Sequence, residues 1–476
     1  AGSGGAVTDV LDVTGGTGNI GLGSGSLGTG LTTGTDNVAI GENAGDALTT
    51  GSDNTFVGDN AGGGTTTASH NTAVGSGALL ANTTGARNTA VGETALTANT
   101  TGDNNVAVGR GTLDANTTAD ANTAVGQAAL GANTTGASNT GLGRAALLAN
   151  TTASFNTAVG ADALTSNTTG ANNTTVGYAS GDALTTGEEN LAIGSNALSA
   201  AVGSGKNTAI GAYALRNDTE GESNVAVGHQ ALNAQNFTTA TSAYNVAVGA
   251  NAGVSVTTAT ELTLIGGLAG DAITTGSTNT LVGYLSGSGI TTGGANTAVG
   301  RKAMEATTTS SDNVAVGSNA MRVNTTGGDN TAVGSAALEA NTTASNNTAV
   351  GRSALAANTT GHSNVAVGKD ALLVNTTGVE NTAVGQIALD ANTTGGSNVA
   401  VGQAAMSSNT TGSNNTAVGK SAAASNTTGA QNTAVGSGAL GVNSTADNNT
   451  AIGYNAVDAN TTGSENTAVG MNALGA

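Results

Sequence analysis

The side chains that most often carry out chemistry are scarce in this sequence and lie far apart. It has 476 residues with no cysteine and three histidines, at His70, His229 and His362. No histidine has another metal-ligating or nucleophilic residue at a spacing typical of a metal site or a catalytic triad. We therefore interpret the histidines as solvent-exposed turn residues, and expect a non-enzyme with no catalytic residue, metal site or cofactor.

Two glycine-rich patterns also invite a chemical interpretation. The stretch from Gly58 to Gly64 superficially resembles a phosphate-binding loop, but it has neither a following Lys-Ser/Thr pair nor a strand-helix-strand context. The regular aspartates of calcium-binding nonapeptide rolls are absent as well. A structural turn is the better interpretation of these glycines.

The triplet Asn-Thr-Thr, which recurs from Asn82 to Asn460, has two further interpretations. It matches the acceptor pattern for N-glycosylation, but a ladder of stacked asparagines followed by a threonine-rich turn explains it equally, and we favour the ladder. Rows of threonine such as Thr83 and Thr84 also suggest an ice-binding surface, the main alternative from another functional class. Against it, these threonines precede Gly in an expected turn, whereas ice binders present theirs on strands.

Composition and charge narrow the possible functions. The chain has 76 Gly, no Pro and 2% aromatic residues, and its 30 acidic and 11 basic residues give a net charge of −19. Absence of Pro favours a fold in which most backbone N–H groups donate hydrogen bonds. The negative charge argues against nucleic acid and anionic membrane surfaces as partners, and no apolar run is long enough for membrane insertion.

A repeat of 17 residues organises the chain. Twenty-seven copies of N-T-A-V-G-x-x-A-L-x-A-N-T-T-G-x-x begin at Asn19, and the last copy is incomplete. Only two spacings differ, one of 18 residues after Asn19 and one of 21 residues after Asn224. We expect residues 1–18 to form an N-terminal lead-in or cap, and residues 19–476 a continuous solenoid with an insertion near residues 236–244.

The repeat positions, numbered 1 to 17, have distinct physical roles. Position 5 is Gly in every copy, from Gly23 to Gly470, which indicates a positive φ or a close backbone approach. Before it, Thr or Val at position 2 and Val, Ile or Leu at position 4 predict a short strand with one buried face. All Lys and Arg residues fall at positions 6, 7, 10 or 17, and we expect these positions and position 16 to face solvent.

A compensatory exchange identifies the residues that face inward elsewhere in the coil. The common form has Leu at position 9 and Asn at 12, whereas several copies have Gly and an aliphatic residue, such as Gly181 with Leu184. Both positions therefore point inward, and this side of the coil is bent or makes a helical turn. The copy with Gly62 and Thr65 breaks the rule and is expected to be a weak coil.

These features together predict an all-β fold, a parallel β-solenoid (β-roll) of 17-residue coils. Coils spaced about 4.8 Å apart would stack equivalent residues into columns. Each coil buries few aliphatic side chains, and their burial contributes less free energy than ordering the coil costs. Inter-coil hydrogen bonds must therefore stabilise the coil, and the shortfall in buried apolar surface favours self-association into a homo-oligomer or filament.

The segment N-T-A-V-G-x-x-A resembles the head repeat of YadA-like trimeric autotransporter adhesins (Hep_Hag-type β-roll), for example from Asn313 to Ala320. Similar repeats occur in phage tail fibres and other surface fibres. The resemblance implies a left-handed β-roll, a homotrimer, and display on a bacterial surface. This repeat is about three residues longer than the family's in its second half.

From the repeat and the resemblance we expect a structural extracellular fibre or adhesin segment that gives reach and multivalent surface attachment, with cell-surface glycans or matrix as possible partners. A phage tail fibre shaft is the nearest alternative. The insertion adds Phe237 and Tyr244 to an aromatic-poor surface. We hypothesise that they form a partner contact, the alternative being a bulge without function.

Overall fold

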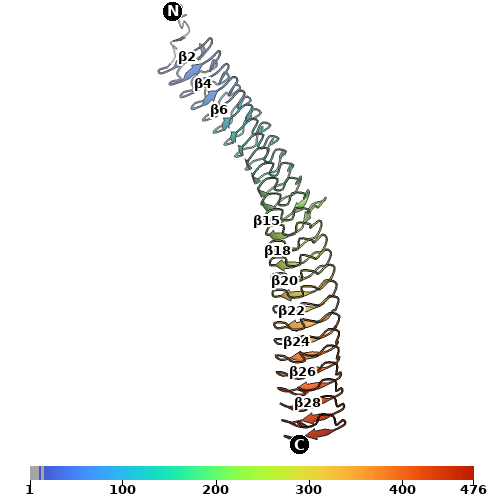
Figure 1. Ribbon diagram of the computed structural model, residues 1–476. Coiled ribbons are helices and arrows are strands. Elements are labelled where there is room, and N and C mark those ends of the chain that lie inside the picture. Colours follow the sequence, from blue (N-terminus) through green and yellow to red (C-terminus); the bar gives the residue numbers. More distant parts are fainter. Residues whose placement is uncertain (1–9, 12–15, 476) are drawn as a thin grey trace, which may run out of the picture. The chain divides into compact units, whose positions relative to one another are not determined.

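The computed structural model describes residues 10–11 and 16–475, and the chain divides into two compact units, Ala1–Ala243 and Tyr244–Ala476. Each unit is a stack of coils, and each coil contributes one short strand to a row of strands (Figure 1). Among the described residues all regular secondary structure is β, with no helix. The predicted all-β class is therefore confirmed.

The strands of the first unit are β1 (Val10–Leu11), β2 (Ile20–Leu22), β3 (Val38–Ile40), β4 (Thr55–Val57), β5 (Thr72–Val74), β6 (Thr89–Val91), β7 (Val106–Val108), β8 (Thr123–Val125), β9 (Thr140–Leu142), β10 (Thr157–Val159), β11 (Thr174–Val176), β12 (Leu191–Ile193), β13 (Thr208–Ile210), β14 (Gly221–Glu222), β15 (Val225–Val227) and β16 (Thr241–Ser242). Those of the second unit are β17 (Val246–Val248), β18 (Thr263–Ile265), β19 (Thr280–Val282), β20 (Thr297–Val299), β21 (Val314–Val316), β22 (Thr331–Val333), β23 (Thr348–Val350), β24 (Val365–Val367), β25 (Thr382–Val384), β26 (Val399–Val401), β27 (Thr416–Val418), β28 (Thr433–Val435), β29 (Thr450–Ile452) and β30 (Thr467–Val469).

Within each unit the coils stack in parallel with a fixed register. Thr72 pairs with Thr89 and Val74 with Val91, and Val314 pairs with Thr331 in the second unit. Because every partner is the same repeat position one copy later, equivalent residues form columns. The structure therefore confirms the predicted parallel solenoid of 17-residue coils.

Hydrogen bonds between coils continue around the non-strand part of each turn. The Leu79 N–H donates to the Ala95 carbonyl at 2.9 Å, and the Thr83 N–H donates to the Thr100 carbonyl at 2.9 Å. Proline lacks this donor and would break such a ladder. The absence of proline thus follows from the architecture.

The buried side of the strand is the side opposite to the one that its aliphatic residues suggest. In the coil beginning at Asn71 the core contains Ala73, Ala78 and Leu79, all fully buried. The aliphatic residue at position 4 lies on the outer side instead, as shown by Val125, which is 37% exposed. Space explains the difference, because Leu at position 9 fills the narrow interior and leaves room for only a methyl group at position 3.

Coils with a large residue at position 3 support this explanation. Phe56 occupies position 3 and is fully buried, and position 9 is Gly both in its own coil, at Gly62, and in the preceding coil, at Gly45. A Cβ at Gly62 would approach the Phe56 ring to 2.5 Å, and one at Gly45 would approach it to 2.7 Å. Phe56 thus occupies the space that Leu at position 9 occupies elsewhere, which the exchange between positions 9 and 12 did not predict; the strength of this coil stays a prediction.

Position 5 requires glycine for both of the predicted reasons. Gly109 has a φ of 137°, and a Cβ on it would lie 2.7 Å from the carbonyl oxygen of Gly126 in the next coil. The expected bend at positions 7 to 12 is produced by left-handed residues rather than by a helical turn. Thr94 at position 7 and Leu96 at position 9 both have a φ of 54°.

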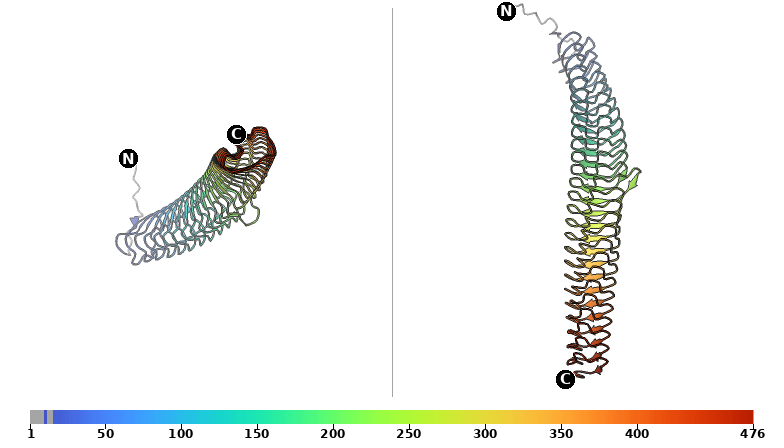
Figure 2. Two further views of the ribbon diagram at one scale, coloured as in Figure 1. Left: turned by 90° about the horizontal axis from the view of Figure 1, so that it is seen from below. Right: turned by 45° about the vertical axis from the view of Figure 1, so that its right-hand side comes forward.

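The predicted lead-in lies in the first unit, and so does the insertion near residues 236–244 except for Tyr244, which begins the second unit. Of the lead-in at residues 1–18, the described part includes β1, which pairs antiparallel with β2, and residues 1–9 and 12–15 lie outside the described residues. In the insertion, β16 pairs in parallel with β14 and stands out from the stacked coils of this unit (green in Figure 2, right).

Candidate functional site

The most extensive candidate surface is the outer side of the strands. We define the strand face of each unit as the first and third residues of β2 to β13 and β15 in the first unit, and of β17 to β30 in the second. Every one of these residues is Thr, Val, Ile or Leu. Most of them are half-buried, and the more exposed ones include Val333 and Val418, at 37% and 38%. A continuous uncharged face of this kind is characteristic of an interaction surface.

A column of asparagines at position 1 fixes the start of each strand. Asn88 is fully buried, and its backbone N–H donates to the Oδ1 of Asn71 at 2.9 Å. Its Nδ2 donates to the Gly102 carbonyl at 2.8 Å. Since each amide satisfies groups in neighbouring coils, this column holds the register that aligns the strand face.

A second column at position 12 confirms the predicted asparagine ladder. Asn99 is fully buried, and its Nδ2 donates to the Oδ1 of Asn82 at 2.9 Å and to the Gly102 carbonyl at 3.0 Å. N-glycosylation would require this nitrogen to be accessible. The folded coils therefore do not present the Asn-Thr-Thr triplets as glycan acceptors.

The two threonine columns that follow differ from one another. At position 13 the hydroxyl of Thr83 donates to the carbonyl of Thr100 at 2.9 Å, so this column extends the inter-coil hydrogen bonding. At position 14 Thr84 is exposed to solvent. Threonine at position 2 also lies on strands, within the strand face.

The three histidines lie in separate surroundings on the surface. His70 Nδ1 lies 3.7 Å from an Asp53 carboxylate oxygen, and His362 Nδ1 lies 3.2 Å from the Ser363 hydroxyl. His229 packs edge-on against Tyr213, with ring centroids 6.1 Å apart. Over residues 10–11 and 16–475, no group of three or more His, Cys, Asp or Glu is placed to hold a metal ion.

The glycine-rich stretch Gly58–Gly64 forms parts of stacked coils. The Gly62 N–H donates to Ala78 at 2.9 Å, and the Gly64 N–H donates to Leu80 at 2.7 Å. These donors are therefore already engaged and do not form a cradle for phosphate.

The two aromatic residues of the predicted partner contact have different environments. Phe237 is 7% exposed, and its backbone N–H donates to the Asp218 carboxylate at 3.0 Å. Tyr244 is 60% exposed and is the first residue of the second unit. Only Tyr244 thus offers an accessible ring. The sequence of the insertion did not show that the two aromatic residues differ in exposure.

Asp218 is a buried acid that the sequence analysis missed. It occupies position 12, where most coils have Asn, and it is fully buried. Burial raises its pKa, while hydrogen bonds from the Phe237 N–H, Gln235 and the Gly221 N–H lower it in part. The Gln235 Nε2 donates to its Oδ2 at 2.6 Å. The sequence signal that could have identified this residue was an Asp at a repeat position where most coils have Asn.

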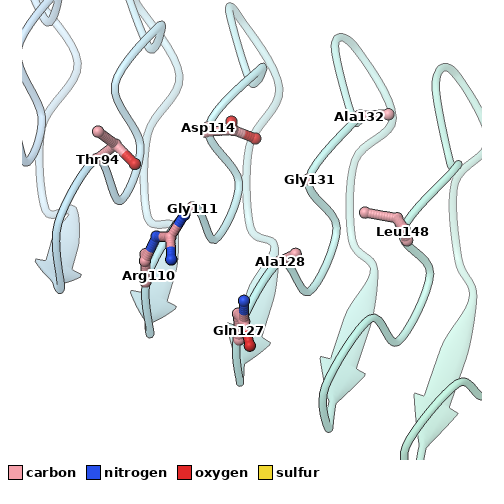
Figure 3. Close-up of a pocket in the computed structure, with 9 residues that line it drawn as sticks. All are labelled: Thr94, Arg110, Gly111, Asp114, Gln127, Ala128, Gly131, Ala132 and Leu148. Atoms are coloured by element: carbon pink, nitrogen blue, oxygen red, sulfur yellow. The ribbon is translucent and has the colours of Figure 1, made fainter.

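A shallow hollow of about 430 Å³ lies beside the turn after the strands in the first unit. Figure 3 shows that side chains from neighbouring coils line it, including Arg110, Asp114, Gln127 and Leu148, and that Gly111 and Gly131 leave it open. Burial raises the pKa of Asp114. The glycines account for the hollow, since they lack the side chains that other coils carry at these positions.

Comparisons with known proteins give no assignment. A search of protein-family models and a search of curated proteins each find no match for this chain. In the part of the chain that the structure describes, no helix is long and apolar enough to cross a membrane.

Proposed function

We propose that the chain is a structural segment of an extracellular fibre or adhesin, without catalytic activity, that gives reach and multivalent attachment to a surface. The observation that carries this proposal is the strand face. Its uncharged rows run along each unit at the inter-coil spacing, and the repeat directs no carboxylate or ammonium group into them. A phage tail fibre shaft would use the same properties.

We propose that a second copy of the chain covers the strand face, in a homotrimer as the family resemblance implies, or in a filament. Two copies carry the same rows at the same spacing, so their β-branched side chains can interdigitate along the whole length of each unit. Many exposed aliphatic side chains, each contributing little, would then be buried together. Uncharged faces also avoid the repulsion expected between chains of net charge −19.

The test is the mass of the full chain in solution, measured by sedimentation or mass photometry. The 44.7-kDa chain should assemble into a multiple of its mass. The double variant Val333→Lys and Val350→Lys should shift the population toward single chains by at least about tenfold, because four or more ammonium groups would meet in one interface.

The matched control places the same charges outside the strand face of the same coils. Thr343 and Thr360 are exposed at position 14, so Thr343→Lys with Thr360→Lys should leave the assembly unchanged. Wild-type chains that remain single at high concentration, or a strand-face variant that assembles like the control, would contradict the proposal.

The strands also favour ice binding as a second candidate, since threonines such as Thr331 and Thr348 stand in register on the strand face and not only in the turn. A freezing-hysteresis assay on the single-chain variant and on the control tests this candidate. Ice-binding activity that is abolished in the Val333→Lys and Val350→Lys variant but retained in the Thr343→Lys and Thr360→Lys control would support this candidate. Absence of activity in the wild-type chain removes it.

A further inference from the structure

Three coils within a stretch of four in the first unit carry aromatic and cationic side chains, which we call the tyrosine patch. It consists of Tyr178, Tyr213, Arg216 and His229 at positions 6, 7 or 10 of the coils beginning at residues 173, 207 and 224, with the coil beginning at 190 between them. Tyrosine is otherwise rare, with five in the whole chain. The patch lies on the turn after the strands and not on the strand face.

Tyr213 is the centre of the patch. The Arg216 guanidinium carbon lies 5.2 Å from the centroid of its ring, and the His229 ring meets it edge-on with an interplanar angle of 88°. These contacts hold the three side chains in a defined arrangement, as a cation–π pair and an aromatic pair do. The amide of Asn233 donates to the Tyr213 carbonyl at 3.0 Å, which fixes the backbone beneath the ring.

The backbone conformation at Tyr213 does not require a tyrosine. Its φ is 61°, in the left-handed region, where other coils often carry Gly, Asn or Asp, such as Asn196 in the preceding coil. The same left-handed conformation recurs at position 7 of other coils and is also adopted there by large side chains such as Lys302 and Ile387. The repeat itself therefore fixes the backbone from which the Tyr213 ring projects.

The patch carries one cation, Arg216, in a chain of negative net charge. Positions 6, 7 and 10 of the coils beginning at 190, 207 and 224 contain no Asp or Glu, and Asp182, at position 10 of the coil that carries Tyr178, lies two coils before Arg216. Among the residues that the structure describes, Arg216 forms no ion pair, whereas Arg110 pairs with Glu93 and Arg322 with Glu339. Its guanidinium is therefore available to an acidic ligand.

We propose that the tyrosine patch binds a carboxylated oligosaccharide. The exposed ring of Tyr178, which is 58% exposed, and the face of the half-buried Tyr213 ring that Arg216 does not cover would pack against the C–H faces of sugar rings. Arg216 would pair with a sugar carboxylate, and His229 would form a hydrogen bond with a hydroxyl group. This inference rests on the proposed function, because it names the class of surface to which the fibre would attach.

Calorimetric titration of the full chain with oligogalacturonate, with uncharged dextran oligomers and with polyglutamate tests the proposal. Oligogalacturonate should bind at least about tenfold more tightly than either of the others, since dextran lacks the carboxylate and polyglutamate lacks the sugar rings. Added salt should weaken this binding. No binding of oligogalacturonate, or equal binding of polyglutamate, would overturn the proposal.

Two substitutions assign the binding to these residues. Tyr213→Asn keeps a residue that tolerates the left-handed backbone, and Arg216→Gln removes only the charge, and each should weaken oligogalacturonate binding about tenfold. Tyr454→Asn is the control, because Tyr454 occupies position 6, is 56% exposed and lies in the second unit. Equal losses in all three variants, or none in the first two, contradict the assignment.

Failure of this proposal can be distinguished from failure of the proposed function. Assembly is measured by mass, and the residues of the strand face are separate from those of the patch. Chains that assemble but bind no oligogalacturonate would overturn the patch alone, whereas single chains that bind it would overturn the fibre assembly alone.

Discussion

The second unit contains two kinds of coil that fill the same interior in different ways. In the coils around Asn358, position 12 is an amide in a ladder, and Leu355 at position 9 fills the apolar space. In the earlier coil with Gly287 and Ile290, position 9 has no side chain, and the buried Ile290 at position 12 fills that space. A Cβ on Gly287 would lie 2.9 Å from the Cδ1 of Ile290 and 2.6 Å from Leu281 at position 3, so a side chain at position 9 and these larger side chains exclude one another.

The comparison shows that interior volume is conserved along the stack, whereas interior polarity is not. An amide column and an aliphatic column are both compatible with the same strand register. What both kinds of coil share is the glycine at position 5 and the hydrogen bonding between strands. Substitutions can test the glycine at position 5, the exchange between positions 9 and 12, and Asp218, which replaces the amide at position 12; we expect their effects to decrease in this order.

The largest effect should come from the shared glycine. Gly109→Ala places a methyl group 2.7 Å from a carbonyl oxygen of the next coil, and we expect it to lower the local unfolding free energy by more than about 4 kcal/mol. Gly111→Ala, two residues away, has nothing within 4 Å of the added methyl and a φ of 62°, so it should cost only about 1 kcal/mol. Hydrogen exchange of the two variants measures the difference, and equal protection in both would contradict our interpretation of position 5.

The exchange between the two solutions can be reproduced in a ladder coil. Asn358→Leu removes hydrogen bonds to Asn341, Gly361 and Asn375 and crowds Leu355, and should destabilise this coil by about 3–5 kcal/mol.

Adding Leu355→Gly makes room for the new side chain, and the double variant should recover about 1–3 kcal/mol relative to the sum of the single changes. Hydrogen exchange over residues 347–380 measures this coupling. Strictly additive losses would show that positions 9 and 12 do not share one volume.

The smallest effect concerns the pH dependence at Asp218 in the first unit. Burial raises the pKa of this carboxyl above its ordinary value, so the folded state favours the protonated form. The corresponding stabilisation is fully present below the pKa of the unfolded chain and is lost as pH rises through the higher folded pKa.

Protection of residues 218–243, corrected for the intrinsic exchange rate, should therefore fall as the pH rises above the ordinary carboxyl range and through the raised pKa of Asp218. Asp218→Asn should abolish this fall, because the amide does not titrate. A variant that keeps the wild-type pH dependence would assign it to another group.

The sequence was sufficient for the repeat, the strand positions, the glycine at position 5 and the exchange between positions 9 and 12, because each recurs in register. It did not reveal which side of the strand is buried. Alternation defines two faces without saying which is inside, and here the width of the coil decides in favour of Ala73 over Val74. The sequence also did not reveal that Phe237 is buried. Its backbone N–H donates to Asp218, 19 residues earlier in the chain, and no local pattern encodes that contact.

Spin-label distances test the stacking and outward direction of the strand face most directly, since the chain has no native cysteine. Val316 and Val401 both occupy position 4 of the second unit and are separated by five coils. With both replaced by labelled cysteine and the protein diluted in unlabelled chain, we expect a narrow distance distribution centred at about 24 Å. A broad distribution extending well beyond that distance, or cysteines that do not react in the folded chain, would contradict the account.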